Sequence, residues 1–217
     1  MSLESALGHS FADPDLLGAA LIHRSHTAEN PSDPDNERLE FLGDAVLQLV
    51  VTDYLYANHA HLREGEMAKV RSACVNRDEL AEIAGRLEVG RHLRLGVGEE
   101  QSGGRDKPSI LADTMEAVLA AVYLDGGLEE ARRVILDHWT DLIEAKVTEP
   151  GGRDYKTRLQ ELLAAGGLRP EYVVEGEGPD HARRFFAKVT VDGAVRGEGS
   201  GKSKKEAEQA AAKAALG

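Results

Sequence analysis

The sequence has a single cysteine, Cys74, and no long run of apolar residues. One cysteine cannot form a disulfide within the chain, which favours a reducing compartment, and we interpret Cys74 as a small buried hydrophobe. No stretch approaches the roughly 20 apolar residues of a membrane-spanning helix, and no N-terminal apolar run resembles a secretory signal. The sequence therefore predicts a cytoplasmic protein with no membrane partner.

Basic residues are also scarce, and the shortage is uneven along the chain. The formal net charge is −12, from 38 acidic and 26 basic side chains. Residues 1–148 hold 27 acidic and 14 basic side chains, whereas residues 149–217 hold 11 acidic and 12 basic ones. An acidic surface repels a polyanion unless metal ions or a separate basic module contact the phosphates. Only residues 149–217, where basic and acidic side chains are nearly equal in number, have a charge balance that suits a basic module of this kind.

Hydrophobic periodicity divides the chain into two domains, and its length allows each to bury a core. Residues 1–148 are predicted to be almost entirely helical, and the linker is predicted at residues 149–152. Within the first domain, helices are expected from Asp13 and over 36–58, 64–74, 77–87, 109–125 and 128–147. Residues 96–107, which are rich in glycine and charged side chains, are predicted to form a mobile loop.

Residues 153–217 have a different pattern. A helix is predicted over 154–165, strands over 172–177, 185–191 and 194–199, a hairpin turn at Asp192-Gly193, and a helix from Ser203. The order α-β-β-β-α predicts a small α+β domain in which two helices cover a sheet. The predicted fold class is therefore an all-α domain followed by a small α+β domain.

Acidic side chains gather on one face of the predicted 36–58 helix. At roughly 100° per residue, Glu37, Glu40 and Asp44 fall within about 60° of one another. A second helix carries Asp113 and Glu116 three residues apart, again on one face. The opposite side of the first helix carries the predicted core stripe of Leu42, Ala45, Val46, Leu49 and Val50.

Two interpretations of these carboxylates are open. Acidic residues on a helix usually form a solvated surface. Here they interrupt strongly apolar sequence with few basic residues at i±4, and clustered carboxylates repel one another unless a cation lies between them. Hard oxygen ligands without clustered histidines suit Mg²⁺ or Mn²⁺ better than zinc. Two such ions could activate a water and stabilise the leaving oxygen in phosphodiester cleavage. Spacing alone does not decide between surface and metal site.

The segment NERLEFLGD (36–44) resembles the signature of the ribonuclease III family. ALIHRSHT (20–27) and LADTMEAVLAAVYLDGG (111–127) resemble two further segments of that family, and the resemblance covers essentially the whole chain. It implies the bacterial arrangement of a nuclease domain and a double-stranded-RNA-binding domain. It also implies an endoribonuclease that hydrolyses double-stranded RNA with Mg²⁺, for which Mn²⁺ could substitute. The products would have 5′-phosphate ends and short 3′ overhangs.

The resemblance also implies roles for individual acidic residues. Carried over by position, Glu40, Asp113 and Glu116 would hold the principal metal, and Asp44 would act with Glu116 as a carboxylate essential to cleavage. Two auxiliary acidic residues are Glu37 and, from a partner subunit, Glu64.

The family further implies a homodimer through the N-terminal domain and a role in processing ribosomal-RNA precursors and other structured transcripts. Phe41, at the border between the acidic face and the core stripe, is expected at the dimer interface. We interpret His23 and His26 as hydrogen-bonded residues at a helix end rather than as bases or ligands.

Three regions of the second domain resemble the contacts of double-stranded-RNA-binding domains, which read A-form shape and 2′-hydroxyls. GKSKKEAEQAAA (201–212) begins the last helix, where exposed amides favour a phosphate. GEGPDHARRFFAKV (176–189) resembles a loop between two strands that enters a minor groove. The expected RNA-binding residues are Thr157, Gln160 and Glu161 on the first helix, His181 in the loop, and Lys202, Ser203, Lys204 and Lys205 at the last helix.

Two other functions remain open from the sequence. One is a double-stranded-RNA-binding protein whose nuclease fold is inactive, against which the presence of all four core carboxylates argues. The other is a metal-dependent phosphohydrolase of small nucleotides, against which the C-terminal domain argues.

Overall fold

The computed structural model describes residues 2–148, 155–164, 166–178 and 183–217. The chain forms two compact units, Met1–Pro150 and Gly151–Gly217, and each is described by itself below. The linker predicted at residues 149–152 and the predicted RNA contact His181 lie outside the described residues. Within the described ranges, no helix combines the length and the apolar character that a membrane span requires.

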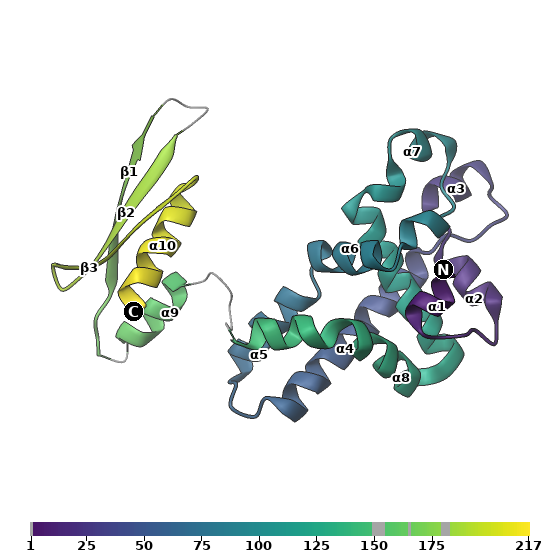
Figure 1. Ribbon diagram of the computed structural model, residues 1–217, viewed down its shortest axis with the longest axis horizontal. Coiled ribbons are helices and arrows are strands. Elements are labelled where there is room, and N and C mark those ends of the chain that lie inside the picture. The colour runs from purple at the N-terminus through teal and green to yellow at the C-terminus, as the bar shows by residue number, and fades with distance from the viewer. Residues whose placement is uncertain (1, 149–154, 165, 179–182) are drawn as a thin grey trace. The chain divides into compact units, whose positions relative to one another are not determined.

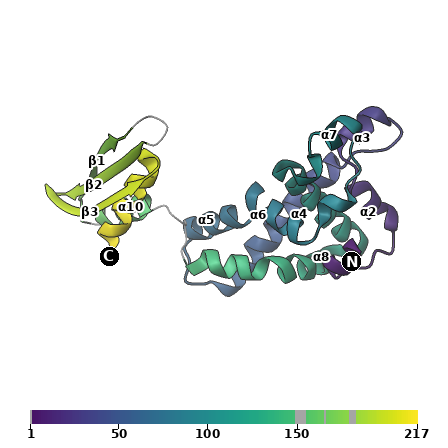
Figure 2. The same cartoon turned by 45° about the horizontal axis from the view of Figure 1, so that its top comes forward.

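The first unit is built of helices, as predicted (Figures 1 and 2). The longest are α4 and α8, which pack along each other, and the shorter helices surround them. The elements are α1 (Leu3–Leu7), α2 (Pro14–Ala20), α3 (Arg24–Glu29), α4 (Glu37–Asn58), α5 (Glu64–Cys74), α6 (Arg77–Arg86), the 3₁₀ turn η1 (Val89–His92), α7 (Val97–Gln101), the 3₁₀ turn η2 (Gly104–Asp106) and α8 (Pro108–Thr148). Helix α8 is interrupted at Gly127, whose φ of 77° is not helical.

The buried face of α4 differs in part from the predicted stripe. Its buried residues are Gly43, Val46, Leu47, Val50, Val51 and Leu55. Val46 and Val50 are buried as predicted, but the prediction was wrong for Ala45 and Leu49, which are exposed. The helix packs on α8 through the face that contains Gly43, which turns Leu49 outward. An apolar side chain is thus left on the surface of the unit.

The second half of α8 contributes the largest fully buried side chain among the described residues, that of Trp139. Trp139 is fully buried, and its indole Nε1 donates a hydrogen bond of 3.1 Å to the backbone carbonyl of Cys74. Cys74 is itself fully buried, and burial raises the pKa of its thiol to about 12. This confirms its interpretation as a buried hydrophobe.

The mobile loop predicted over residues 96–107 contains instead the short helix α7 and the turn η2. The Arg105 guanidinium donates to the backbone carbonyls of Gly90 and Leu93, both at 2.9 Å. Lys107 Nζ donates to Glu99 Oε1 at 2.5 Å. The prediction failed because these bonds order a segment whose glycines and charges are typical of a loop.

The second unit has the predicted α-β-β-β-α order. Its elements are α9 (Tyr155–Ala164), β1 (Pro170–Glu177), β2 (Arg184–Val191), β3 (Ala194–Gly201) and α10 (Lys204–Leu216). The strands form an antiparallel sheet in the order β1-β2-β3, and α9 and α10 cover one face of it (Figure 1). The β2–β3 turn has positive φ at Asp192 (52°) and Gly193 (74°), as a two-residue type I′ hairpin requires.

Helix α4 approaches the backbone of α8 closely at Gly43. A Cβ atom built there would lie 1.8 Å from the backbone oxygen of Glu116 and 2.5 Å from its carbonyl carbon. Both distances are far below van der Waals contact, and the obstructing atoms belong to rigid helix backbone. Only glycine therefore allows the two helices to pack at this distance.

We expect Gly43→Ala to destabilise the protein by at least about 1–3 kcal/mol, because overpacking against backbone forces the helices apart. Gly85→Ala in α6 is the matched control, since its Cβ would meet no atom within 4 Å. That change should stabilise by about 0.5–1 kcal/mol, because alanine loses less backbone entropy than glycine. Urea unfolding monitored by circular dichroism measures both, and equal stability of Gly43→Ala and the unchanged protein would contradict the close approach.

Candidate active site

Three carboxylates meet where α4 crosses α8. Glu40 on α4 and Asp113 and Glu116 on α8 each offer one oxygen, and these oxygens all lie within 4.8 Å of one another. All three residues are half-buried. In the part of the chain that the structure describes, no other group of three or more His, Cys, Asp or Glu residues has this geometry. The acidic faces predicted on two separate helices thus form one cluster.

The electrostatics of the cluster favour a bound cation. Burial, followed by the charges of Asp44, Glu40 and Asp113, raises the pKa of Glu116 to about 8. Burial and the charges of Asp113 and Glu37 raise the pKa of Glu40. Burial also raises the pKa of Asp113. The charges of Glu40, Asp113 and Asp44 therefore make ionisation of Glu116 less favourable, and a divalent cation with oxygen ligands would remove that penalty.

Asp44 lies next to this cluster without belonging to the group of three. Both of its carboxylate oxygens accept hydrogen bonds from Gln48 Nε2, each at 2.9 Å. Gln48 is one helical turn further along α4, so the bond orients the Asp44 carboxylate. The charge of Asp44 also raises the pKa of Glu116. This arrangement suits a carboxylate that orients a water beside a metal.

A pocket of about 360 Å³ opens beside the carboxylates, and we call it the α3–α8 pocket. It includes Glu37, which is exposed and faces Arg24 Nη1 at 3.5 Å. Its full lining is His23, Arg24, Asn36, Glu37, Glu40, Glu99, Lys107, Ser109, Ile110 and Asp113. Sequence reasoning did not assign the cations Arg24 and Lys107 to the site. Arg24 follows His23 in a segment that the resemblance covers, whereas Lys107 lay in the predicted loop.

Glu64 is not brought to the cluster within this chain. It is exposed in the first turn of α5 and lines a small pocket of about 120 Å³ with Tyr56 and Met67. Its assignment to the site of a partner subunit stays a prediction. Phe41 is 83% exposed on α4, and Leu49 (53%) and Tyr56 (76%) are exposed on the same helix.

His23 and His26 both make the hydrogen bonds expected at a helix end. His23 caps α3 by accepting from the backbone N–H of Ser25 at 3.2 Å. His26 Nε2 lies 3.0 Å from an oxygen of Asp33.

The predicted RNA contacts of the second unit lie on two helices. On α9, Gln160 and Glu161 are exposed and Thr157 is half-buried. At the start of α10, Ser203 is the N-cap and accepts from the backbone N–H of Glu206 at 3.2 Å. Lys202, Lys204 and Lys205 are exposed around that helix end. Their contact with RNA stays a prediction.

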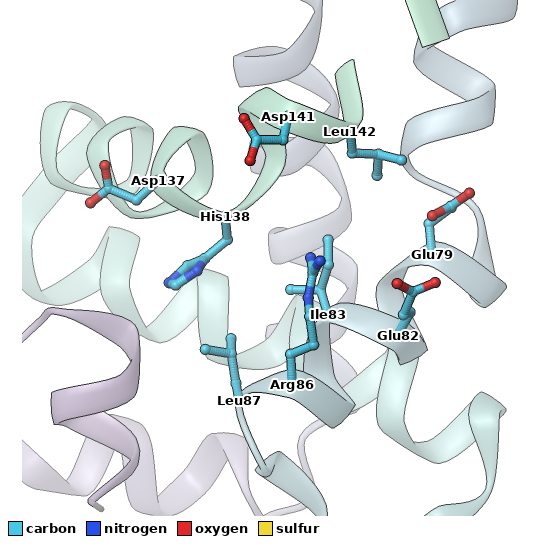
Figure 3. A pocket seen from close by; sticks show the side chains of 9 residues that line it. All are labelled: Glu79, Glu82, Ile83, Arg86, Leu87, Asp137, His138, Asp141 and Leu142. Atoms are coloured by element: carbon cyan, nitrogen blue, oxygen red, sulfur yellow. The ribbon is translucent and has the colours of Figure 1, made fainter. Parts of the chain in front are cut away.

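A second acidic pocket, of about 420 Å³, lies between α6 and the second half of α8 (Figure 3). Asp137 and Asp141 line it from α8, Glu79 and Glu82 line it from α6, and the Arg86 side chain lies between the two pairs (Figure 3). The carboxylates are therefore spread around the pocket rather than gathered on one point.

Both units match known protein families. Residues 13–142 match the family model described as ribonuclease-III-like, and residues 155–216 match the double-stranded RNA binding motif. Ribonuclease 3 from Thermobifida fusca is 56% identical over 203 residues, which are 93% of this chain and 85% of that protein. Ribonuclease 3 from Streptomyces coelicolor is 54% identical over 214 residues, which are 98% of this chain and 77% of that protein.

A solved structure agrees with these matches. The nuclease domain of ribonuclease III from Campylobacter jejuni, described with a flexible region involved in dimer formation, is 43% identical with a TM-score of 0.59. The similarity covers 64% of this chain and 96% of that one.

The raised pKa of Glu116 predicts a pH-dependent stability of the metal-free protein. Its value of about 8 in the fold lies above the 4.5 of an ordinary glutamate, so the native state binds the extra proton between these values. Stability should then fall as pH rises through this window. Glu116→Gln, which cannot ionise, should be more stable than the unchanged protein in EDTA at pH 7. We expect the free energy of unfolding of the variant to be about 1–2 kcal/mol higher. This is less than the full pKa shift would give, because solvent screens a partly exposed carboxyl.

The measurement is urea unfolding in EDTA at pH 4.5 and pH 7. The difference between the two proteins should be small at pH 4.5, where Glu116 is protonated in the fold and about half protonated in the unfolded chain, and should appear at pH 7. A difference of the same size at both pH values would show that the effect is packing and not charge.

Proposed function

The chain belongs to the ribonuclease III family and is an endoribonuclease of double-stranded RNA, and we propose that Glu40, Asp113 and Glu116 hold the Mg²⁺ on which cleavage depends. The observation that carries the proposal is the convergence of three carboxylate oxygens within 4.8 Å beside the α3–α8 pocket. Their hard oxygens and mutual repulsion fit a divalent ion, and Mn²⁺ is an expected substitute. A small-nucleotide phosphohydrolase would have no use for the double-stranded RNA binding motif at residues 155–216.

When bound, Mg²⁺ supplies charge stabilisation for phosphodiester hydrolysis and lowers the pKa of a coordinated water. Asp44, oriented by Gln48, accepts a hydrogen bond from the attacking water and so directs its lone pair. Glu116 is half-buried, so solvent screens its charge less than it screens the charge of an exposed side chain. Glu37 is an auxiliary acid at the edge of the pocket. Products with 5′-phosphate ends follow when water attacks phosphorus and the 3′-oxygen leaves.

The second unit supplies the binding of RNA in this proposal. Lys202, Lys204 and Lys205 contact phosphates around the N-terminus of α10, where the backbone N–H groups and the helix dipole add to their charge. Thr157, Gln160 and Glu161 on α9 contact ribose 2′-hydroxyls in a minor groove, and His181 contacts the next one. The duplex is therefore recognised by its shape. The substrates in this proposal are ribosomal-RNA precursors and other structured transcripts in the cytoplasm.

We further propose a homodimer through the first unit. The exposed apolar side chains of Phe41, Leu49 and Tyr56 on α4 form a surface that a second copy would cover. A two-fold axis there would repeat the carboxylate cluster, so that each site addresses one strand of an antiparallel duplex. Cuts offset across the minor groove would give short 3′ overhangs, and Glu64 would reach the site of the partner subunit.

Glu116→Gln should abolish cleavage of a long RNA duplex in Mg²⁺ while the affinity for the duplex stays within about twofold. The amide keeps the shape of the side chain but removes the charge that binds the metal. Cleavage is followed on gels with Mg²⁺ and with EDTA, and binding is followed in EDTA. Glu82→Gln, in the acidic pocket between α6 and α8, is the matched control and should cleave normally. Near-normal turnover by Glu116→Gln in saturating Mg²⁺ would falsify its assignment as a ligand.

Phe41→Ala should weaken the dimer at least about tenfold, because each interface loses two buried aromatic side chains. The stability of the monomer should change little, since the side chain is 83% exposed in the single chain. Sedimentation equilibrium over a range of concentrations measures the association. Val97→Ala, at a 62% exposed position on α7, is the control for loss of a surface hydrophobe. Unchanged association of Phe41→Ala would place the dimer interface elsewhere.

A further inference from the structure

One ring nitrogen of His23, Nδ1, makes the hydrogen bonds that cap the N-terminus of α3. This nitrogen accepts a hydrogen bond from the backbone N–H of Ser25 at 3.2 Å, and it also lies 2.8 Å from Ser25 Oγ. The backbone N–H of Gly96 donates to that same Oγ at 2.9 Å. Because a backbone N–H can only donate, Nδ1 is an acceptor and carries no proton.

The proton of a neutral His23 ring is therefore on Nε2. Burial keeps the pKa of His23 below its usual value, although the charges of Glu99, Asp113 and Glu37 oppose this. The ring is thus neutral at neutral pH, with Nε2–H as its only donor. The hydrogen bonds of the cap hold the ring by its Nδ1 edge, so the Nε2 edge is the one available to the α3–α8 pocket that His23 lines.

The pocket combines this donor with two cations. Arg24 follows His23 on the chain and faces Glu37 at 3.5 Å, and Lys107, the residue before α8, is paired with Glu99. The carboxylates Glu40 and Asp113 form another part of the lining. A group that accepts hydrogen bonds and carries negative charge fits the donor and the cations, and in RNA that group is a phosphate.

We propose that His23 is a substrate-positioning residue whose Nε2–H donates to a non-bridging oxygen of an RNA phosphate next to the cleaved bond. The inference rests on the proposed function, since it takes the carboxylates of the same pocket as the metal site. It gives the cap of α3 a second role. The bonds that cap the N-terminus of this helix also fix the tautomer that the substrate needs.

His23→Asn separates the two roles. Asparagine is a good N-cap, and its side-chain oxygen can replace Nδ1 as the acceptor, but nothing replaces the Nε2–H donor. The thermal unfolding midpoint should therefore stay near that of the unchanged protein. On an RNA duplex, kcat/KM should fall about ten- to hundredfold, as expected for a lost hydrogen bond to a charged group. His61→Asn, at an exposed histidine outside the pocket, is the matched control and should cleave normally.

Phosphorothioate substitution distinguishes a contact with RNA from a structural role. Sulfur is a weak hydrogen-bond acceptor, so one substituted oxygen near the cut should slow the unchanged protein. The same substitution should have no further effect on His23→Asn, and the Mg²⁺ concentration for half-maximal rate should be unchanged. An intact sulfur effect at every position in His23→Asn, an increased Mg²⁺ requirement, or normal cleavage by this variant would each overturn the proposal. Failure of the unchanged protein to cleave RNA in Mg²⁺ would instead overturn the proposed function itself, and this inference with it.

Discussion

The contact between Gly43 and the backbone of Glu116 is the constraint on which the rest of the first unit depends. It allows α4 to approach α8 closely enough for Glu40 to meet Asp113 and Glu116. That closeness has an energetic cost, because the carboxylates repel one another and are half-buried. The cost is offset on the same helix pair, where Leu47 and the neighbouring buried side chains of α4 pack into the core. Site and core are therefore two faces of one helix–helix interface.

The sequence predicted the features that depend on local periodicity. The longer helices, the break near Gly127 and the order of the second unit all follow from patterns within about 20 residues. Spacing also placed the carboxylates on common faces, but only the family resemblance indicated that the two faces meet. The segment containing α7 and η2 was mispredicted because its stabilising bonds come from Arg105 to carbonyls of Gly90 and Leu93, beyond any local pattern. The outward side of α4 was mispredicted because α8 decides which face is covered.

Other stabilising contacts join residues so far apart in the chain that local sequence patterns could not predict them. His9, just after α1, has Nδ1 2.8 Å from Glu130 and Nε2 2.9 Å from Asp125, more than 100 positions along the chain. These bonds fix the N-terminal helices to α8 on either side of its interruption. Nothing in the local sequence around His9 indicates such partners. Like the Gly43 contact, they depend on the path of α8 through the whole unit.

The environment of Trp139 allows the unfolding of the first unit to be followed by the intrinsic fluorescence of the chain. It is the single tryptophan of 217 residues, it is fully buried, and its N–H bonds to the Cys74 carbonyl. Indole emission shifts to the red when water reaches the ring, so the emission wavelength follows the unfolding of the first unit. The second unit has tyrosines, Tyr155 and Tyr172, but no tryptophan. Fluorescence and circular dichroism recorded together would therefore separate the unfolding of the two units without any added label.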